Sequence, residues 1–334
     1  MAKTVSWGVI SPAKIGVEKV IPAMQKGSAS RIDAIASRDL SRAKETAAKL
    51  GVRNAYGSYE ELLADPTIEA IYNPLPNELH VPWTIKALEA GKHVLCEKPI
   101  ALDAAEAKQL IAAREKSGKL VAEAFMVRFH PQWRRAREIV RSGEIGDPKA
   151  IHTLFSYYLL DPTNIRNIPP GGGGVYDIGC YCIISGRYIF GAEPLRVVST
   201  LDRDPKMGTD RLASALVEFP GSRHLLFTCA TQLSAMQRVT VVGDKGRVEI
   251  QIPFNAPPDR KTRIFFDSGV DLFGGGARVE EFAICDQYTL QGDAFSRAIL
   301  GEEKLEFPIE DAIAQMKVID ALFRSAQSGK WETV

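Results

Sequence analysis

The sequence has few cysteines. There are five in 334 residues, an odd number scattered along the chain, which is typical of reduced thiols in a cytosol rather than of a disulfide framework. They are Cys96, Cys180, Cys182, Cys229 and Cys285. Cys180 and Cys182 stand two positions apart in an expected helix, so their side chains point to different faces and make a poor metal pair. We therefore expect no metal site.

The sequence also lacks an excess of charge and a long apolar run. Its net charge of +1 gives no electrostatic footprint for nucleic acid or for an anionic membrane, and no stretch approaches a transmembrane helix. The first residues enter an apolar strand at once, without a basic and then apolar leader. We expect a cytoplasmic protein with neither a nucleic-acid nor a membrane partner. A content of 45% apolar and 25% charged residues is ordinary for a globular enzyme, and the length favours two domains.

What the sequence does contain, up to about residue 125, is a regular alternation of strands and helices. Apolar strands are expected at 4–10, 31–37, 68–72, 93–96 and 120–125. Helices are expected at 15–26 and 39–50, from 58, at 77–91 and at 103–118. Strands joined by helical crossovers predict a doubly wound parallel sheet, an α/β Rossmann domain over 1–125. Ligands bind at the carboxyl ends of the strands in such sheets.

The pattern changes after residue 125. A basic helix is expected from Pro131 to Ser142, and helices at 174–190 and 309–328. Long strand-like stretches fill the rest, at 149–160, 194–202, 211–219, 223–231, 237–242 and 247–252, with a hairpin turn at 243–246. We predict a second, α+β domain over 126–334, built on a large and mostly antiparallel sheet that serves substrate binding and oligomerisation. The helix at 309–328 is a candidate to pack back on the first domain.

The first strand is followed by a degenerate phosphate-binding turn, from Ser11 to Gly16. It occupies the place of the Gly-x-Gly-x-x-Gly turn, with Ser and Ala instead of two glycines. Small residues still let the backbone approach a pyrophosphate, and amides at a helix start favour anions. The candidate cofactor contacts here are Ser11, Pro12, Ala13, Lys14 and Ile15.

The end of the second strand indicates which dinucleotide binds. An NAD-binding domain usually carries an acidic residue there for the ribose hydroxyls, but this strand ends at Ser37 and Arg38, with Arg42 a turn further on. A guanidinium can hold a 2′-phosphate, and Ser37 can donate a hydrogen bond to it. We expect NADP as the cofactor, with NAD also possible. A solvated Arg38 that merely opens a helix is the alternative.

Two loops after later strands carry further candidates. Glu97 and Lys98 directly follow a strand, which puts the lysine at the carboxyl edge of the sheet, where it can hold a substrate hydroxyl. Earlier in the chain, Leu75, Pro76, Asn77 and His80 follow another strand, and His80 lies near the expected nicotinamide ribose. A lone histidine with a surface or structural role is the alternative.

A glycine run in the second domain, Gly171–Gly174, opens a helix that carries Asp177 and Tyr181. A spacing of i, i+4 places these two side chains on one helical face. The start of a helix favours an ionised Asp177 and tyrosinate character at Tyr181. A tyrosine near a lysine is a reasonable proton donor and acceptor for a carbonyl group. The alternative is a glycine-rich loop before an aromatic core helix.

Taken together these segments resemble the Gfo/Idh/MocA oxidoreductases. The matching segments are the first turn, Ser37-Arg38, Pro76-Asn77-x-Leu79-His80, Glu97-Lys98-Pro99 and Gly172-Gly173-Gly174-x-x-Asp177-Ile178-Gly179-x-Tyr181, in family order. The tyrosine makes the chain most similar to the branch of glucose–fructose oxidoreductase, dihydrodiol dehydrogenase and NADP-dependent xylose dehydrogenase. The departures from the family pattern are Ser11 and Ala13, where glycines are usual.

The resemblance implies a site and a reaction. Lys98, Asp177 and Tyr181 would form the catalytic cluster, Pro99 would follow a cis peptide, and Glu97 and Lys98 would touch the nicotinamide ribose. Candidate substrate contacts are Arg128, Asn164 and Arg166, besides Asp177 and Tyr181. The expected activity is reversible NADP-dependent hydride transfer with a sugar, polyol or trans-dihydrodiol. A sugar–sugar oxidoreductase with tightly held NADP and a non-catalytic NADP-binding regulator are the alternatives. The resemblance also implies a homodimer or homotetramer built on the second domain's sheet.

Overall fold

The computed structural model describes residues 3–334, which divide by their contacts into two units. The first unit holds the residues up to Met126 together with Asp286–Ile313. The second holds Val127–Cys285 and Ala314–Val334. This division differs from the sequence-based one in the segment 286–313, which groups with the first unit rather than with the second.

The first unit contains a parallel sheet of six strands in the order β3-β2-β1-β4-β5-β6, which confirms the predicted parallel sheet and adds one strand, β3, that the sequence pattern did not predict. The order reverses direction between β1 and β4, which makes the carboxyl ends of these strands the expected ligand edge. The strands are β1 (Val5–Ile10), β2 (Ser30–Ala36), β3 (Asn54–Tyr56), β4 (Ala70–Asn73), β5 (His93–Glu97) and β6 (Val121–Ala124). All six residues of β1 are buried, as expected for a strand covered on both faces.

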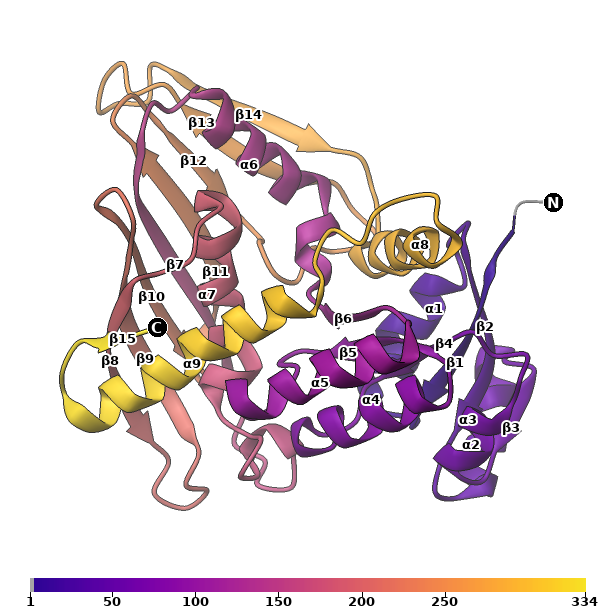
Figure 1. Ribbon diagram of the computed structural model, residues 1–334. Coiled ribbons are helices and arrows are strands. Elements are labelled where there is room, and N and C mark those ends of the chain that lie inside the picture. The colour runs from indigo at the N-terminus through magenta and orange to yellow at the C-terminus, as the bar shows by residue number, and fades with distance from the viewer. Residues whose placement is uncertain (1–2) are drawn as a thin grey trace. The chain divides into compact units, whose positions relative to one another are not determined.

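Helices connect these strands (Figure 1). They are η1 (Gly16–Val20), α1 (Ile21–Met24), α2 (Leu40–Leu50), α3 (Tyr59–Ala64), η2 (Asn77–Leu79), α4 (His80–Glu89) and α5 (Ala104–Ser117). Three expected helix starts are confirmed, because Asp39, Ser58 and Asp103 each accept a hydrogen bond from a backbone N–H in the first turn.

Two local predictions in this unit are wrong. The helix after the first strand is not a regular α-helix, since Gly16–Val20 is a π-helical stretch. Asn77 does not cap α4 directly, because it opens the short 3₁₀ turn η2, and α4 begins only at His80. Both differences lie next to the ligand edge, and π-helical turns occur frequently at functional sites.

The segment 286–313 contributes α8 (Gln287–Leu300) and the start of α9 (Ile309–Ser328) to the first unit. The ring of Phe295 lies 5.7 Å from that of Trp7 on β1, and Nε1 of Trp7 donates to Oγ of Ser296 at 3.0 Å. Asp293 accepts hydrogen bonds from the backbone of Ser28 and Ala29. These contacts explain why a helix so far along the chain belongs to the first unit, and its sequence gives no sign of them.

The second unit is built on nine strands in the order β14-β13-β12-β11-β7-β10-β9-β8-β15. All neighbouring pairs are antiparallel except β7 with β10, so the predicted mostly antiparallel sheet is confirmed. The strands are β7 (Pro148–Tyr158), β8 (Arg196–Arg203), β9 (Asp210–Phe219), β10 (Arg223–Ala230), β11 (Gln232–Gly243), β12 (Arg247–Ile250), β13 (Thr262–Asp267), β14 (Ala277–Phe282) and β15 (Glu332–Thr333). The hairpin turn expected at 243–246 joins β11 to β12. The sequence analysis missed β13, β14 and β15.

One face of this sheet is covered by helices. The remaining helical elements of the chain are η3 (Met126–Phe129), α6 (Pro131–Ser142), η4 (Ile165–Asn167), η5 (Val175–Gly179) and α7 (Cys180–Phe190). Helix α7 contacts β7 and β10, and α6 contacts β12 and β13. The strands alternate accordingly, so that Ile151, Thr153 and Phe155 of β7 are buried beneath the helices.

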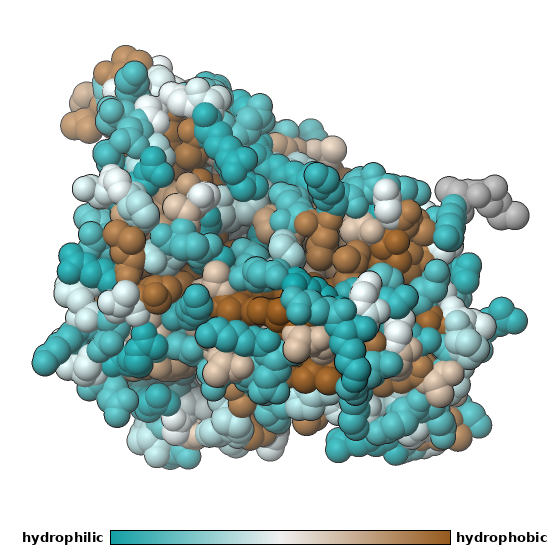
Figure 2. Space-filling view, viewed as in Figure 1, coloured by the Kyte–Doolittle hydropathy of each residue, from teal (hydrophilic) through white to brown (hydrophobic). Residues whose placement is uncertain are grey.

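The surface mixes polar and apolar residues (Figure 2). The brown group at the upper left of that view lies over the turn between β13 and β14, where Val270, Leu272 and Phe273 are exposed. Within residues 3–334, no helix combines the length and apolar character needed to cross a membrane.

Candidate functional site

The turn after β1 contains a residue in the left-handed region of backbone conformation. Ser11 adopts a φ of 82°, a left-handed value that glycine accepts far more readily than serine. Its N–H donates to the carbonyl oxygen of Ala36 at 2.9 Å, which ties the turn to the end of β2. The serine therefore takes the same conformation as the glycine that is usual at this position.

The glycine that closes the turn is less constrained. A Cβ added at Gly16 would lie 3.6 Å from Cε1 of Tyr72, an ordinary contact distance. The π-helical stretch begins at this residue, and no side chain caps the start of the helix. Its backbone amides are thus not occupied by a side-chain cap, which suits an anionic ligand.

Two arginines lie at the carboxyl end of β2. Arg38 and Arg42 are both exposed, and Nη2 of Arg42 reaches the carbonyl oxygen of Pro12 in the first turn at 3.5 Å. The nearest carboxylate, that of Asp39, accepts hydrogen bonds from the N–H groups of Ser41 and Arg42 as the cap of α2. The structure thus brings two cations to this corner, while the acidic residue is engaged by the helix. Ser37, also a candidate here, is buried, and its Oγ accepts from the N–H of Asp39.

His80 joins two loops of the same edge. It is 1% exposed, and its Nδ1 and Nε2 lie 2.7 Å from the carbonyl oxygens of Pro99 and Leu75. Burial lowers the pKa of His80 to about 4, against the effect of the two carbonyl contacts. The imidazole therefore links the loop after β4 to the loop after β5 instead of presenting a nitrogen to solvent. Pro76 lies at the start of η2, next to Asn77.

Lys98 follows β5 at the same sheet edge. The Lys98–Pro99 peptide is cis, as the family resemblance implies. Glu97 accepts a hydrogen bond from the hydroxyl of Tyr72 at 2.6 Å through Oε1, and its Oε2 accepts from the N–H of Lys98 at 3.3 Å. Burial and the Glu97 carboxylate raise the pKa of Tyr72 well above its usual value, so Tyr72 remains a donor. The backbone at Lys98 is thereby fixed by Glu97 before it and by the contact of His80 with Pro99 after it.

In the second unit, the glycine run is held by Asp210 at the start of β9. Its Oδ2 accepts a hydrogen bond from the N–H of Val175 at 2.7 Å. A Cβ added at Gly173, whose φ is 125°, would lie 2.2 Å from Oδ1 of Asp210. A Cβ at Gly172 would lie 2.6 Å from the carbonyl oxygen of Ile168. Gly172 and Gly173 are therefore required by close packing.

Asp177 and Tyr181 follow this loop, but not on a regular α-helix as predicted. Val175–Gly179 is π-helical, and α7 starts at Cys180. Oδ2 of Asp177 accepts a hydrogen bond from the hydroxyl of Tyr157 at 2.5 Å and lies 3.1 Å from Nε of Arg166. The coulombic attraction of Asp177 raises the pKa of Arg166.

The ring of Tyr181 is enclosed by aromatic residues. Its centroid lies 5.5 Å from that of Phe254 and 5.9 Å from that of Phe155, and these two rings stack on each other at 4.7 Å. Tyr181 is 6% exposed. The ring packing fixes the direction of the Tyr181 side chain.

The other candidate substrate residues are placed differently. The side chain of Arg128 is buried, with 2% of the residue exposed. Asn164 caps the short turn η4, where its Oδ1 accepts from the N–H of Arg166 at 3.2 Å. Arg166, the third further candidate, forms an ion pair with Asp177.

Sequence reasoning missed Tyr157 and Asp210. Tyr157 lies in an unremarkable strand pattern, 20 residues before Asp177. Asp210 opens another strand, 35 residues after Val175. Of these two residues, Asp210 could have been found from the sequence. An acidic side chain at the start of an otherwise apolar strand is expected to accept a hydrogen bond from another segment.

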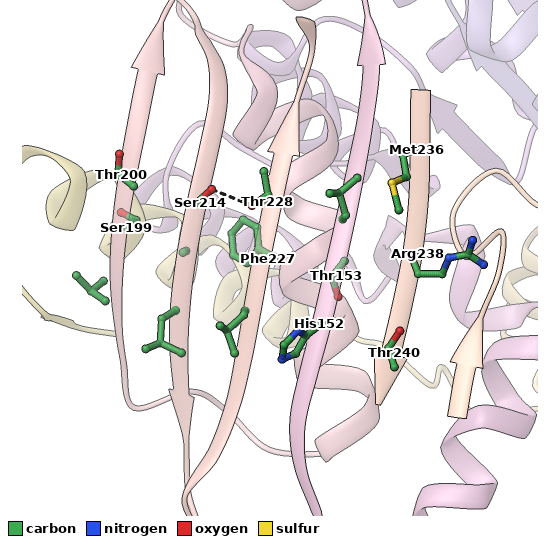
Figure 3. Close-up of a pocket in the computed structure, with 15 residues that line it drawn as sticks. His152, Thr153, Ser199, Thr200, Ser214, Phe227, Thr228, Met236, Arg238 and Thr240 are labelled. Carbon is green, nitrogen blue, oxygen red and sulfur yellow. Dashed lines mark hydrogen bonds between the residues drawn. The ribbon is translucent and has the colours of Figure 1, made fainter. Parts of the chain in front are cut away.

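The face of the large sheet opposite α6 and α7 is open and slightly hollowed. Figure 3 shows its lining, with His152 on β7, Thr228 on β10 and Met236 on β11. Further lining residues are Leu154, Val198, Thr200, Ser214, Leu216, Leu226, Arg238 and Thr240. Oγ of Ser214 and Oγ1 of Thr228 share a hydrogen bond of 2.8 Å across it. Small polar and aliphatic side chains thus alternate on a face with few charges.

Two family models match the chain. One describes an oxidoreductase family with an NAD-binding Rossmann fold and matches residues 5–125. The other describes a GFO/IDH/MocA C-terminal domain and matches residues 133–249.

Individual proteins match along nearly the whole chain. An uncharacterized oxidoreductase of Rhizobium meliloti is 47% identical over 99% of each chain. A D-xylose 1-dehydrogenase (NADP(+)) of Haloferax volcanii is 36% identical, covering 97% of this chain and 98% of its own. Among solved structures, an aldose–aldose oxidoreductase from Caulobacter crescentus complexed with glycerol has a TM-score of 0.91 at 25% identity, covering 99% of this chain and 100% of its own.

These matches confirm the resemblance, the fold class and the expectation of an oxidoreductase that acts on CH–OH groups. The chain belongs to the GFO/IDH/MocA oxidoreductase family, with an NAD(P)-binding Rossmann domain followed by the family's C-terminal domain.

Proposed function

We propose that this protein is an NADP-dependent dehydrogenase that reversibly oxidises a hydroxyl group of a sugar, polyol or trans-dihydrodiol. The observation that carries the proposal is the tyrosine–carboxylate pair of the second unit. Tyr181 is packed in one direction by two aromatic rings, and Asp177, four residues earlier, receives a tyrosine hydroxyl and a guanidinium. Such fixed groups suit proton exchange with a substrate hydroxyl.

The corner at the end of β2 fits NADP. Exposed Arg38 and Arg42 suit a 2′-phosphate, and the carboxylate of Asp39 is engaged in capping α2. The turn at Ser11, Pro12 and Ala13, with Lys14 and Ile15 beside it, suits the pyrophosphate. Glu97, Lys98 and the loop Leu75–Asn77 would lie along the nicotinamide ribose, with His80 supporting them from behind.

When bound, NADP accepts the hydride in oxidation and supplies it in reduction. The chain's own residues manage the proton. In oxidation Tyr181 acts as a tyrosinate, a form that the positive charge of Lys98 favours, and takes the proton from the substrate hydroxyl to become the neutral phenol. Lys98 also stabilises the developing alkoxide by its charge, and Asp177 orients the hydroxyl. In reduction the same groups act in the opposite order.

The substrate class is supported by the relatives. The Haloferax protein is named for xylose and NADP(+), and the Caulobacter structure is named for exchange between two aldoses. The latter favours a second candidate, a sugar–sugar oxidoreductase that retains NADP through each turnover. Release of NADP on dilution and net formation of NADPH from an aldose alone would support the dehydrogenase over this alternative. A non-catalytic regulator would show neither.

The test is Tyr181→Phe, measured with a panel of aldoses, polyols and diols with NADP and with NAD. We expect turnover to fall roughly 100- to 10,000-fold, while the Kd for NADP stays unchanged. Tyr188→Phe is the matched control, because it removes a hydroxyl from the same helix at a residue whose OH contacts the carbonyl of Arg128. Equal activity of Tyr181→Phe and wild type would remove Tyr181 from the reaction.

We also propose that the open face of the large sheet pairs with a second copy of the chain, giving a dimer or tetramer. Half-exposed apolar residues such as Leu226 and Met236 lie on it among small polar ones. Met236→Asp should convert the assembly to monomers in analytical ultracentrifugation. Leu272→Asp, on the exposed β13–β14 turn, should leave it intact. A monomeric wild type would contradict the proposal.

A further inference from the structure

Asp177 is a meeting point of three segments of the second unit. Its Oδ2 is the acceptor for the hydroxyl of Tyr157 at 2.5 Å and for Nε of Arg166 at 3.1 Å. Tyr157 comes from β7, Arg166 from η4 and Asp177 from η5. Two donors from different elements therefore act on one carboxylate oxygen.

Each donor remains a donor over the working pH range. Burial and the Asp177 carboxylate raise the pKa of Tyr157 well above its ordinary value, so this hydroxyl keeps its proton beside the carboxylate. Arg166 carries a permanent charge, and Asp177 raises its pKa further. Hydrogen bonds to the charged form of a carboxyl group favour that form.

The same strand also contacts Tyr181. Phe155 and Tyr157 stand two positions apart on β7, and thus on one face of the sheet. Phe155 packs edge-on against the ring of Tyr181 at 5.9 Å, and Tyr157 bonds to Asp177. Strand β7 thereby positions both of the second unit's proposed reactive side chains.

We infer that Tyr157 is a positioning residue of the reaction: with Arg166 it holds Asp177 ionised and in one orientation, so that this carboxylate can orient the substrate hydroxyl whose proton goes to Tyr181. The inference rests on the proposed function. Tyr157 is not itself the proton acceptor, because its deprotonation beside the Asp177 carboxylate would place two negative charges in contact.

The experiment compares Tyr157→Phe with Tyr158→Phe. The first removes only the hydroxyl bound to Asp177. The second removes the hydroxyl of the next residue, which is 67% exposed on the other face of the strand. For Tyr157→Phe we expect kcat to fall about tenfold, as for a lost hydrogen bond to a charged group, with the Kd for NADP unchanged. The acid limb of its kcat/KM profile should move to higher pH, because the carboxylate binds a proton more readily. Tyr158→Phe should behave like wild type.

A readout independent of turnover separates this inference from the proposed function. Carbon-13 NMR of labelled aspartate carboxyls, with the Asp177 signal identified by its loss in Asp177→Asn, should show Asp177 titrating at higher pH in Tyr157→Phe. Arg166→Gln, at a half-exposed side chain, should move the same signal in the same direction. An unchanged Asp177 titration in both variants overturns the inference. This outcome can be read whether or not the wild type turns over any substrate of the panel. A shifted titration with unchanged kcat in Tyr157→Phe also overturns the role in the reaction.

Discussion

The nucleotide edge of the first unit and the carboxylate cluster of the second unit are built in different ways. The edge consists mainly of backbone at the ends of neighbouring strands, with the Ser11 turn tied to β2 and the Lys98–Pro99 loop tied to His80. The cluster consists of side chains from separate elements that meet at one atom, Oδ2 of Asp177. Backbone sites of this kind follow from topology, whereas side-chain sites follow from packing.

This difference predicts how each region responds to substitution. At the nucleotide edge, a change that leaves the backbone intact should alter one specific contact only. In the cluster and its glycine loop, a single change should disturb several neighbours.

The largest effect is expected from Lys98→Met at the nucleotide edge. It keeps the length of the side chain and removes its charge, so turnover should fall roughly 100- to 10,000-fold while the Kd for NADP changes little. Steady-state kinetics and fluorescence titration measure the two quantities. Lys86→Met, at an exposed lysine paired with Glu60, is the control and should be silent. A loss of NADP affinity as large as the loss of turnover would assign the lysine to cofactor binding alone.

In the second unit, Asp210→Ala should lower the free energy of unfolding by about 1–3 kcal/mol, since it leaves the buried N–H of Val175 without its acceptor. Turnover should fall with it, because the loop before Asp177 loses its anchor. Chemical denaturation followed by circular dichroism gives the stability.

Asp210→Asn separates the charge of this residue from its hydrogen bond. Burial raises the pKa of Asp210, so the stabilisation that its proton contributes is present at acid pH and is lost as the pH rises through the folded-state pKa. The stability of the Asn variant relative to wild type should therefore increase as the pH rises above the ordinary range of an aspartate. A stability difference that does not change with pH would show that burial of the ionised Asp210 carboxylate does not destabilise the fold.

Removal of the guanidinium at Arg38 or Arg42 should raise the KM for NADP about tenfold, the loss of one charge-assisted hydrogen bond, and leave the KM for NAD unchanged. The kcat with either cofactor should stay near that of wild type, because these residues do not touch the reacting atoms. Arg53→Ala, on the same unit but away from β2's end, serves as the reference. Equal effects on NADP and NAD would contradict a 2′-phosphate contact.

The smallest effect is expected from Ser11→Gly. It relieves a left-handed conformation at φ 82° and should raise the free energy of unfolding by at most about 1 kcal/mol, without loss of NADP binding. Thermal unfolding measures it. A lower free energy of unfolding in Ser11→Gly would mean that the serine side chain stabilises the fold by more than its left-handed backbone conformation destabilises it.

The predictability of the molecule follows the same contrast. The parallel sheet, the helix starts at Asp39, Ser58 and Asp103 and the edge at Lys98 follow from local patterns, and the structure has them. The π-helical stretches do not, because they depend on packing around Gly16 and Val175 rather than on periodicity. The place of α8 depends on a contact between Phe295 and Trp7, across nearly the whole chain.

The candidate site shows the same limit. Asp177 and Tyr181 are identified by a motif, but Tyr157 carries no local signal, because its strand neighbours are ordinary alternating residues. The pairing of Arg166 with Asp177 likewise carries no local signal. It depends on how η4 packs against η5.

The central claim is that Lys98 and Tyr181 act on the same substrate hydroxyl. A double-mutant cycle tests it most directly, with kcat measured for Lys98→Met, Tyr181→Phe and the double variant on one substrate. When two residues act together in one step, losing the second adds little once the first is gone. The kcat of the double variant is then close to that of the slower single variant. The account predicts that outcome, whereas losses that multiply in full would show that the two side chains work independently and would contradict it.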